Sequence, residues 1–144
     1  KEDLANAYAL KERNTTARIF YAAVRFRLGE VDAAKELIGD TYKAEFAMND
    51  YGISSVEVAK DYAYLAELYP FRIAAAPDDA QNRASLAFLY YELDQPEEAV
   101  RVLETAASEI PSFAPTATCY ASNIATGKDP SLPCAATTTT PNAN

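Results

Sequence analysis

Residues 82–112 read NRASLAFLYYELDQPEEAVRVLETAASEIPS, and this stretch decides the fold expected for the chain. Apolar residues recur at intervals of three or four over 86–93 and again over 99–106, which is the spacing of one face of an α-helix. The DQP sequence between them predicts a tight turn. It places Pro96 at the start of the second helix, where the missing N–H of proline costs nothing. The stretch therefore predicts an antiparallel pair of amphipathic helices.

The spacing of individual residues in this pair resembles the tetratricopeptide repeat (TPR) family. That family's pattern has Trp, Leu-Gly, Tyr, Ala, Phe and Pro at fixed intervals. At these positions the chain has Arg83, Leu86-Ala87, Tyr90, Ala99, Leu103 and Pro111. The small residues Ala87 and Ala99 are expected to lie between the two helices. A generic antiparallel helix pair is the alternative, because it also needs small residues where its helices meet.

Other parts of the chain repeat features of this pair. Pro77-Asp78-Asp79-Ala80 precedes Pro111-Ser112-Phe113-Ala114 by 34 residues, which is the TPR period. Residues 28–34 also parallel residues 93–99. Because one helix pair cannot bury its own apolar face, the resemblance implies an all-α, right-handed α-solenoid of TPR-like helix pairs. Two recognisable repeats are expected around a divergent middle one.

The pattern predicts one helical domain over 1–127 and an extended Pro/Thr-rich tail over 128–144. A first helix is expected over 1–13. The segment 113–126 is expected to form a C-terminal capping helix, ended by Gly127 in the position after the helix that glycine favours.

The middle of the chain departs most from the family. The run 49–52 predicts a loop, and Ser54 and Glu57 have the spacing of a capping box. A long helical pattern follows over 56–76, and Pro70 is expected to kink it or to split it. How the helices of residues 41–76 pair is left open by the sequence.

The charge of the chain excludes several kinds of partner. The 144 residues include 21 acidic and 13 basic ones, for a formal net charge of −8. Nucleic acid and anionic membrane surfaces both require a basic face, so neither is expected as a partner. No apolar run approaches the length of a transmembrane helix, so membrane insertion by this chain is not expected.

The chain also lacks the residues that most catalytic and metal sites use. It has no histidine, its two cysteines lack CxxC spacing, and its four glycines are too scattered for a phosphate-binding loop. We therefore expect no catalytic, cofactor-binding or metal-binding residues, and no enzyme. A secreted hydrolase that uses a pair of carboxylates is the alternative, because such carboxylates leave no local signature.

Cys119 and Cys134 are predicted to form a disulfide, which favours an extracellular, periplasmic or cell-surface location. Two buried thiols in a cytosolic protein are the alternative. The chain begins at Lys1 rather than at methionine, which we interpret as a processed mature form or a fragment. Asn14-Thr15-Thr16 matches an N-glycosylation acceptor, and the same residues can equally cap a helix.

The ten tyrosines and six phenylalanines exceed what one small core needs. In TPR proteins, one side of the first helix of each pair lines a concave groove. By this resemblance, the candidates for partner contact are Ile19, Phe26, Phe88 and Tyr91. The alternative is that these residues bury against the divergent middle repeat.

Taken together, the residues favour a non-enzymatic, extracytoplasmic TPR protein that acts through protein–protein contacts. Solenoids have unlike ends, and end-to-end contacts that do not close generate filaments. We therefore expect a filament-like structural subunit whose partner is a copy of itself, with the Thr-rich tail lying on a neighbour. The alternatives are a monomeric scaffold for another protein and the soluble TPR tail of a membrane polysaccharide polymerase or ligase.

Overall fold

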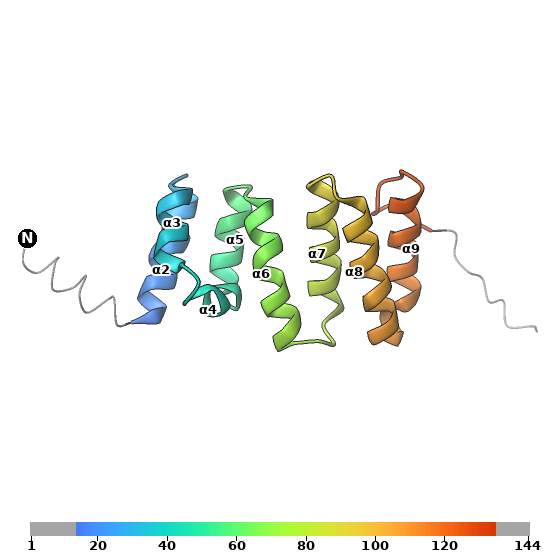
Figure 1. The fold of residues 1–144 in the computed structure, drawn as a ribbon, viewed down its shortest axis with the longest axis horizontal. Helices are drawn as coiled ribbons and strands as arrows, with labels where there is room; N and C mark the ends of the chain where they lie inside the picture. The colour runs from blue at the N-terminus through green and yellow to red at the C-terminus, as the bar shows by residue number, and fades with distance from the viewer. Residues whose placement is uncertain (1–13, 135–144) are drawn as a thin grey trace, which may run out of the picture. The chain divides into compact units, whose positions relative to one another are not determined.

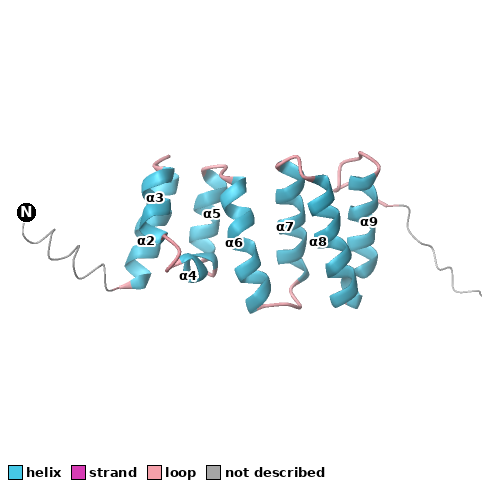
Figure 2. Ribbon diagram, in the orientation of Figure 1, coloured by secondary structure: helices cyan, strands magenta, loops and turns pink. Residues whose placement is uncertain are grey.

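The computed structural model describes residues 14–134, and every regular element in this range is helical (Figures 1 and 2). The all-α expectation is therefore confirmed. The helix predicted over 1–13 lies outside the described residues. The elements, in chain order, are α2 (Thr15–Arg27), α3 (Val31–Ile38), α4 (Lys43–Ala47), α5 (Asp50–Val58), α6 (Tyr62–Ala75), α7 (Ala80–Glu92), α8 (Pro96–Glu109), the 3-10 turn η1 (Pro111–Phe113) and α9 (Ala114–Ala125).

The chain divides into two compact units, unit 1 (Lys1–Asn82) and unit 2 (Arg83–Asn144). The boundary lies inside α7, after its first three residues. The sequence, interpreted as a single helical domain up to residue 127, did not indicate this boundary. Each unit is therefore described by itself.

The same helix ending occurs four times among the residues that the structure describes. Gly29, Lys60, Asp94 and Gly127 follow α2, α5, α7 and α9, and each has a positive φ between 56° and 79°. At each ending, two backbone N–H groups donate to carbonyls of the last helical turn in the pattern of a Schellman motif. The four residues are 31, 34 and 33 positions apart. The chain thus repeats one local structure at nearly the 34-residue interval seen in its sequence.

Unit 1 is built around the ring of Phe26. Its ring centroid lies 5.9 Å from that of Phe46 on α4 and 5.6 Å from that of Tyr64 on α6. α2 contacts both α3 and α5, while α4 and α5 contact α6. A Cβ atom on Gly52 would lie 3.1 Å from the Phe46 ring, so α5 approaches this core closely. The structure thereby gives the pairing of the middle helices that the sequence left open.

The division between α5 and α6 lies ten residues before the proline that was expected to cause it. Lys60 takes the left-handed conformation and ends α5, and the side chain of Asp61 then accepts a hydrogen bond from the Tyr64 N–H to begin α6. Pro70 lies inside α6. The predicted split at Pro70 was therefore wrong, because a Schellman ending at a lysine carries no glycine signal in the sequence, while a kink at Pro70 stays a prediction.

The predicted capping box was also wrong. Asn49, in the run expected to be a loop, caps α5 by accepting a hydrogen bond from the Gly52 N–H at 2.8 Å. Ser54 lies in the middle of that helix instead of at its start.

Unit 2 contains the helix pair from which the fold was predicted. Ala87 and Ala99 are fully buried in a single cluster, as the spacing predicted, together with Leu103, Ala117, Ala121 and Ile124. Pro96 is the first residue of α8, and α8 ends at Glu109, just before Pro111. The Arg83 guanidinium forms an ion pair with Glu109 and so connects the first turn of α7 to the end of α8.

Residues 128–134 were expected to begin the extended tail, but they fold back onto α9. The buried side-chain amide of Asn123 donates to the carbonyl oxygens of Leu132 at 2.8 Å and Pro130 at 3.3 Å. Pro130 is buried, and Cys134 is bonded to Cys119 on α9, with their Cα atoms 5.5 Å apart. The remaining tail, 135–144, lies outside the described residues.

Candidate functional site

The predicted groove residues of unit 1 are part of its core. Ile19 is 7% exposed and Phe26 is 1% exposed. Neither residue is exposed enough to contact a partner. Their assignment to a partner-binding groove is therefore corrected, and both belong to the core of unit 1. The physical reason is the pair of ring contacts that Phe26 makes with Phe46 and Tyr64.

Phe88 and Tyr91 of α7 are half-buried in unit 2. The Phe88 ring lies 5.3 Å from that of Tyr120 on α9, and Tyr91 packs against the cluster that contains Ala87. Both residues keep some exposed surface, so their contact with a partner stays a prediction.

Among the described residues of unit 1, the most exposed aromatic contact joins Phe20 on α2 to Tyr51 on α5. Their rings stack with centroids 5.7 Å apart, although Phe20 is 56% exposed and Tyr51 is 41% exposed. The guanidinium of Arg27, two turns along α2 from Phe20, lies 4.6 Å from the centroid of the Tyr51 ring. We call Phe20, Arg27 and Tyr51 the aromatic surface.

Two serines of α5 hold Arg27 in place. Its Nε donates to the Ser55 Oγ at 2.9 Å and its Nη2 donates to the Ser54 Oγ at 3.0 Å. The fully buried Ser55 in turn donates to the backbone carbonyl of Tyr51 at 2.6 Å. The arginine is thus oriented before any partner arrives, which reduces the entropy that binding would cost.

Sequence reasoning placed the groove one residue away from this surface. The predicted stripe contained Ile19 and Phe26, whereas Phe20 and Arg27 follow them directly in the chain. A step of one residue turns the helix by about 100°. Apolar periodicity therefore identified the buried stripe, and the signal for the surface was the pair of Phe20 and Arg27, seven residues apart.

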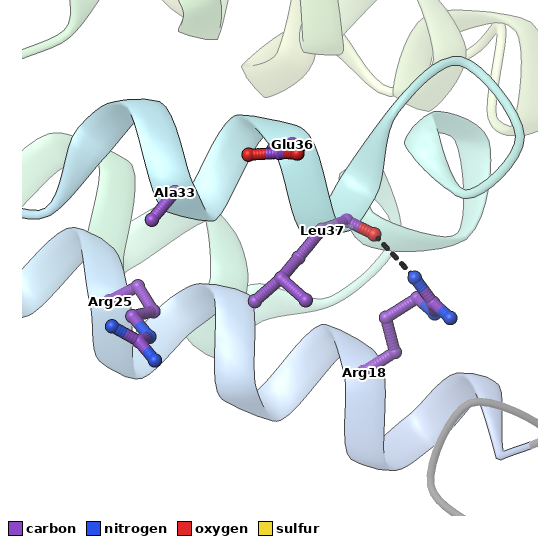
Figure 3. Close-up of a pocket in the computed structure, with 5 residues that line it drawn as sticks. All are labelled: Arg18, Arg25, Ala33, Glu36 and Leu37. Atoms are coloured by element: carbon purple, nitrogen blue, oxygen red, sulfur yellow. Dashed lines mark hydrogen bonds between the residues drawn. The ribbon is translucent and has the colours of Figure 1, made fainter. Parts of the chain in front are cut away.

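A pocket of about 380 Å³ lies between α2 and α3 (Figure 3). Arg18 and Arg25 line it from α2, and Ala33, Glu36 and Leu37 line it from α3. The Arg18 Nη1 donates to the Leu37 carbonyl oxygen at 3.1 Å, and Arg25 forms an ion pair with Glu30. Both arginines thus support the contact between α2 and the segment that follows it, and this is the role we assign to the pocket residues.

A cluster of charges surrounds the ring of Tyr64. Burial raises the pKa of Tyr64 to about 12, and the nearby carboxylates of Glu67, Asp61 and Asp40 act in the same direction. Lys35 pairs with Asp61 at 2.5 Å and Lys43 with Glu67 at 2.7 Å, so the lysines neutralise two of these carboxylates. The packing of α3, α4 and α6 around this ring explains the cluster.

Asn14, the predicted glycosylation acceptor, has a local role at the start of α2. The Asn14 Oδ1 accepts hydrogen bonds from the N–H groups of Thr16 and Ala17 and so caps α2. Asn14 is also exposed, and its glycosylation stays a prediction.

Within residues 14–134, no cluster of His, Cys, Asp or Glu could hold a metal ion. Nor does any helix there have the length and apolar character needed to cross a bilayer. Comparison of the chain with protein-family models, with curated proteins and with solved structures gives no match. The function is therefore argued from the residues and their geometry.

Proposed function

We propose that the chain is a TPR-like helical repeat protein that binds other proteins and does not catalyse a reaction. The observation that carries this proposal is the aromatic surface. Tyrosine and arginine are enriched in the parts of protein interfaces that contribute most of the binding energy. Phe20 and Tyr51 are exposed and stacked, and Arg27 lies over the Tyr51 ring and is held by hydrogen bonds to two serines.

The distribution of exposed apolar side chains supports unit 1 as the binding unit. Among the described residues, eight large hydrophobic side chains are exposed, and seven of them belong to unit 1: Phe20, Tyr21, Leu28, Met48, Tyr51, Val58 and Phe71. Single exposed apolar residues need no explanation, but a concentration in one unit favours an interaction surface there.

The repeated Schellman endings support the TPR-like part of the proposal. They follow α2, α5, α7 and α9 at intervals close to the TPR period. The proposed architecture is a right-handed solenoid in which α2, α5 and α7 are the first helices of successive pairs and α9 is the capping helix. The Cys119–Cys134 bond supports a location outside the cytoplasm, because disulfides persist in oxidising compartments.

A second copy of the chain is the partner that we favour. The chain has an excess of carboxylates, and Arg27 supplies a fixed positive charge in the centre of the aromatic surface. An acidic protein of another kind is the alternative partner. The proposed end-to-end filament would use residues 135–144 as well, and these lie outside the described residues.

Sedimentation velocity over a range of protein concentrations tests the proposal. Self-association is expected, and the double variant Phe20→Ala/Tyr51→Ala should weaken it by about tenfold or more, as loss of interface anchors does. Leu132→Ala removes an exposed apolar side chain from unit 2 and is the matched control. A chain that stays monomeric at every concentration would exclude a copy of itself as the partner.

A further inference from the structure

A groove in unit 2 runs between α8 and α9. Two adjoining cavities of about 340 Å³ and 450 Å³ form it, and they share Val100, Glu104 and Ala125. The floor of the groove is apolar, with Leu103 and Ala117 fully buried beneath it. The folded-back loop 128–134 packs instead against Cys119 and Asn123, neither of which lines the groove.

The wall that α9 contributes carries no charge. None of the twelve residues of α9 is charged, although 24% of the chain is charged and its net charge is −8. Thr118, Ser122 and Ala125 are nevertheless exposed. An uncharged exposed helix is where two copies of an acidic chain can approach each other with the least repulsion.

The wall that α8 contributes carries charges of both signs. Arg101 lines the groove one turn before Glu104, and Glu97 lines it one turn before Arg101. In a contact between two identical surfaces, residue i meets residue j and residue j meets residue i. Arg101 of each copy can therefore pair with Glu104 of the other. Within its own chain Arg101 forms an ion pair with Glu98 at 2.7 Å. A solvent-exposed ion pair of this kind contributes little to the stability of the fold, so Arg101 can exchange it for a partner on the other copy.

We propose that this groove is a two-fold contact between two copies of the chain, with α9 of each copy lying in the groove of the other. The occupant is a second copy because the uncharged helix suits an acidic partner and because Arg101 of each copy can pair with Glu104 of the other. The contact does not depend on the aromatic surface of unit 1, since no residue is shared between them.

The test measures, by sedimentation equilibrium, the dimer dissociation constant of the full chain in a Phe20→Ala/Tyr51→Ala background, in which association through the aromatic surface is removed. Ser122→Arg fills the centre of the contact with a long side chain and should raise the constant by about tenfold or more, because the helices of the two copies can then no longer approach each other closely. Thr105→Arg, on an exposed part of α8 outside the groove, should leave it unchanged. Circular dichroism confirms that both variants keep their helices.

A charge exchange tests the two-fold pairing directly. Arg101→Glu alone and Glu104→Arg alone should each weaken the dimer, while the double variant should restore it. The reason is that the glutamate introduced at position 101 of one copy would face the arginine introduced at position 104 of the other. Because the Phe20→Ala/Tyr51→Ala background removes the contacts of the aromatic surface, these changes report on the groove alone.

Three outcomes would overturn the proposal. One is a dimer dissociation constant that Ser122→Arg leaves unchanged. Another is a double variant Arg101→Glu/Glu104→Arg whose dimer is as weak as that of either single variant. The third is a full chain that stays monomeric but dimerises when residues 135–144 are removed, which would assign the groove to that segment of the same chain.

Discussion

The stacked rings of Phe20 and Tyr51 join α2 to α5 at the surface of unit 1, while the ring of Phe26 joins α2 to α4 and α6 in its interior. α2 therefore uses aromatic residues on two of its faces for two different purposes. The interior contacts fix the helices of unit 1, and the surface contact leaves two rings and an arginine accessible to a partner.

The close packing of Ala99 gives the first prediction. Ala99 is fully buried beside Ala87, so Ala99→Leu should overpack this contact and lower the free energy of unfolding by about 1–3 kcal/mol. Ser108→Leu adds a leucine at an exposed position of the same helix and should change it by less than about 0.5 kcal/mol. Urea titration measures both. Equal stabilities would show that Ala99 is not enclosed.

Tyr64 gives a prediction for alkaline pH. Its pKa is about 12 in the folded chain and 10.0 in the reference state, so the unfolded chain releases this proton first as the pH rises. The contribution of Tyr64 is fully present below pH 10 and is lost as the pH rises through the window from 10 to about 12. Tyr64→Phe should therefore make the free energy of unfolding fall less steeply in that window. Tyr51→Phe, at an exposed ring, is the control, and identical slopes for the two variants would contradict the prediction.

The disulfide gives a prediction for reducing conditions. The bond closes a loop of 15 residues, so its reduction should cost about 3 kcal/mol in the chain-entropy treatment. Thermal melts with and without reductant measure this loss. The double variant Cys119→Ser/Cys134→Ser should melt like the reduced chain and be insensitive to reductant. A wild-type melt that reductant does not change would contradict the bond.

The two roles considered for Asn14 can be separated by two substitutions. Asn14→Ala removes the cap of α2 and should cost about 1 kcal/mol, whereas Asn14→Asp keeps a capping oxygen and should cost much less. Both substitutions remove the glycosylation acceptor. The intact mass of the wild-type chain, secreted from a host that glycosylates, would then show whether Asn14 is modified.

The helix pair of unit 2 was predicted well because its signals are local. Pro96 at the start of α8, Pro111 after its end and the burial of Ala87 and Ala99 all follow from spacing within residues 82–112. Such signals do not depend on the rest of the chain.

The middle of unit 1 was predicted poorly because it depends on distant contacts. Arg72 on α6 donates to the Ala47 carbonyl at 2.9 Å, to Asp50 at 3.0 Å and to Asn82 at 3.3 Å. No spacing in the sequence predicts these partners. The left-handed Lys60 likewise departs from the glycine that a Schellman ending favours. Tertiary packing overrode local preference at both places.

The aromatic surface was missed because it lies on a different face of α2 from the stripe that periodicity identifies. Periodicity shows that α2 has an apolar stripe, but it does not show whether the core or a partner covers that stripe. The ring contacts of Phe26 decide for the core, and only then is Phe20 assigned to the surface.

The bond between Cys119 and Cys134 also determines how α9 would respond to mechanical force. Tension applied to the chain beyond Cys134 passes through the sulfur atoms to Cys119, in the first half of the helix. Residues 120–133, including the turn at Gly127, would carry none of that load. A pull on the end of the chain would therefore act on the interior of unit 2 without first unravelling the loop that precedes Cys134.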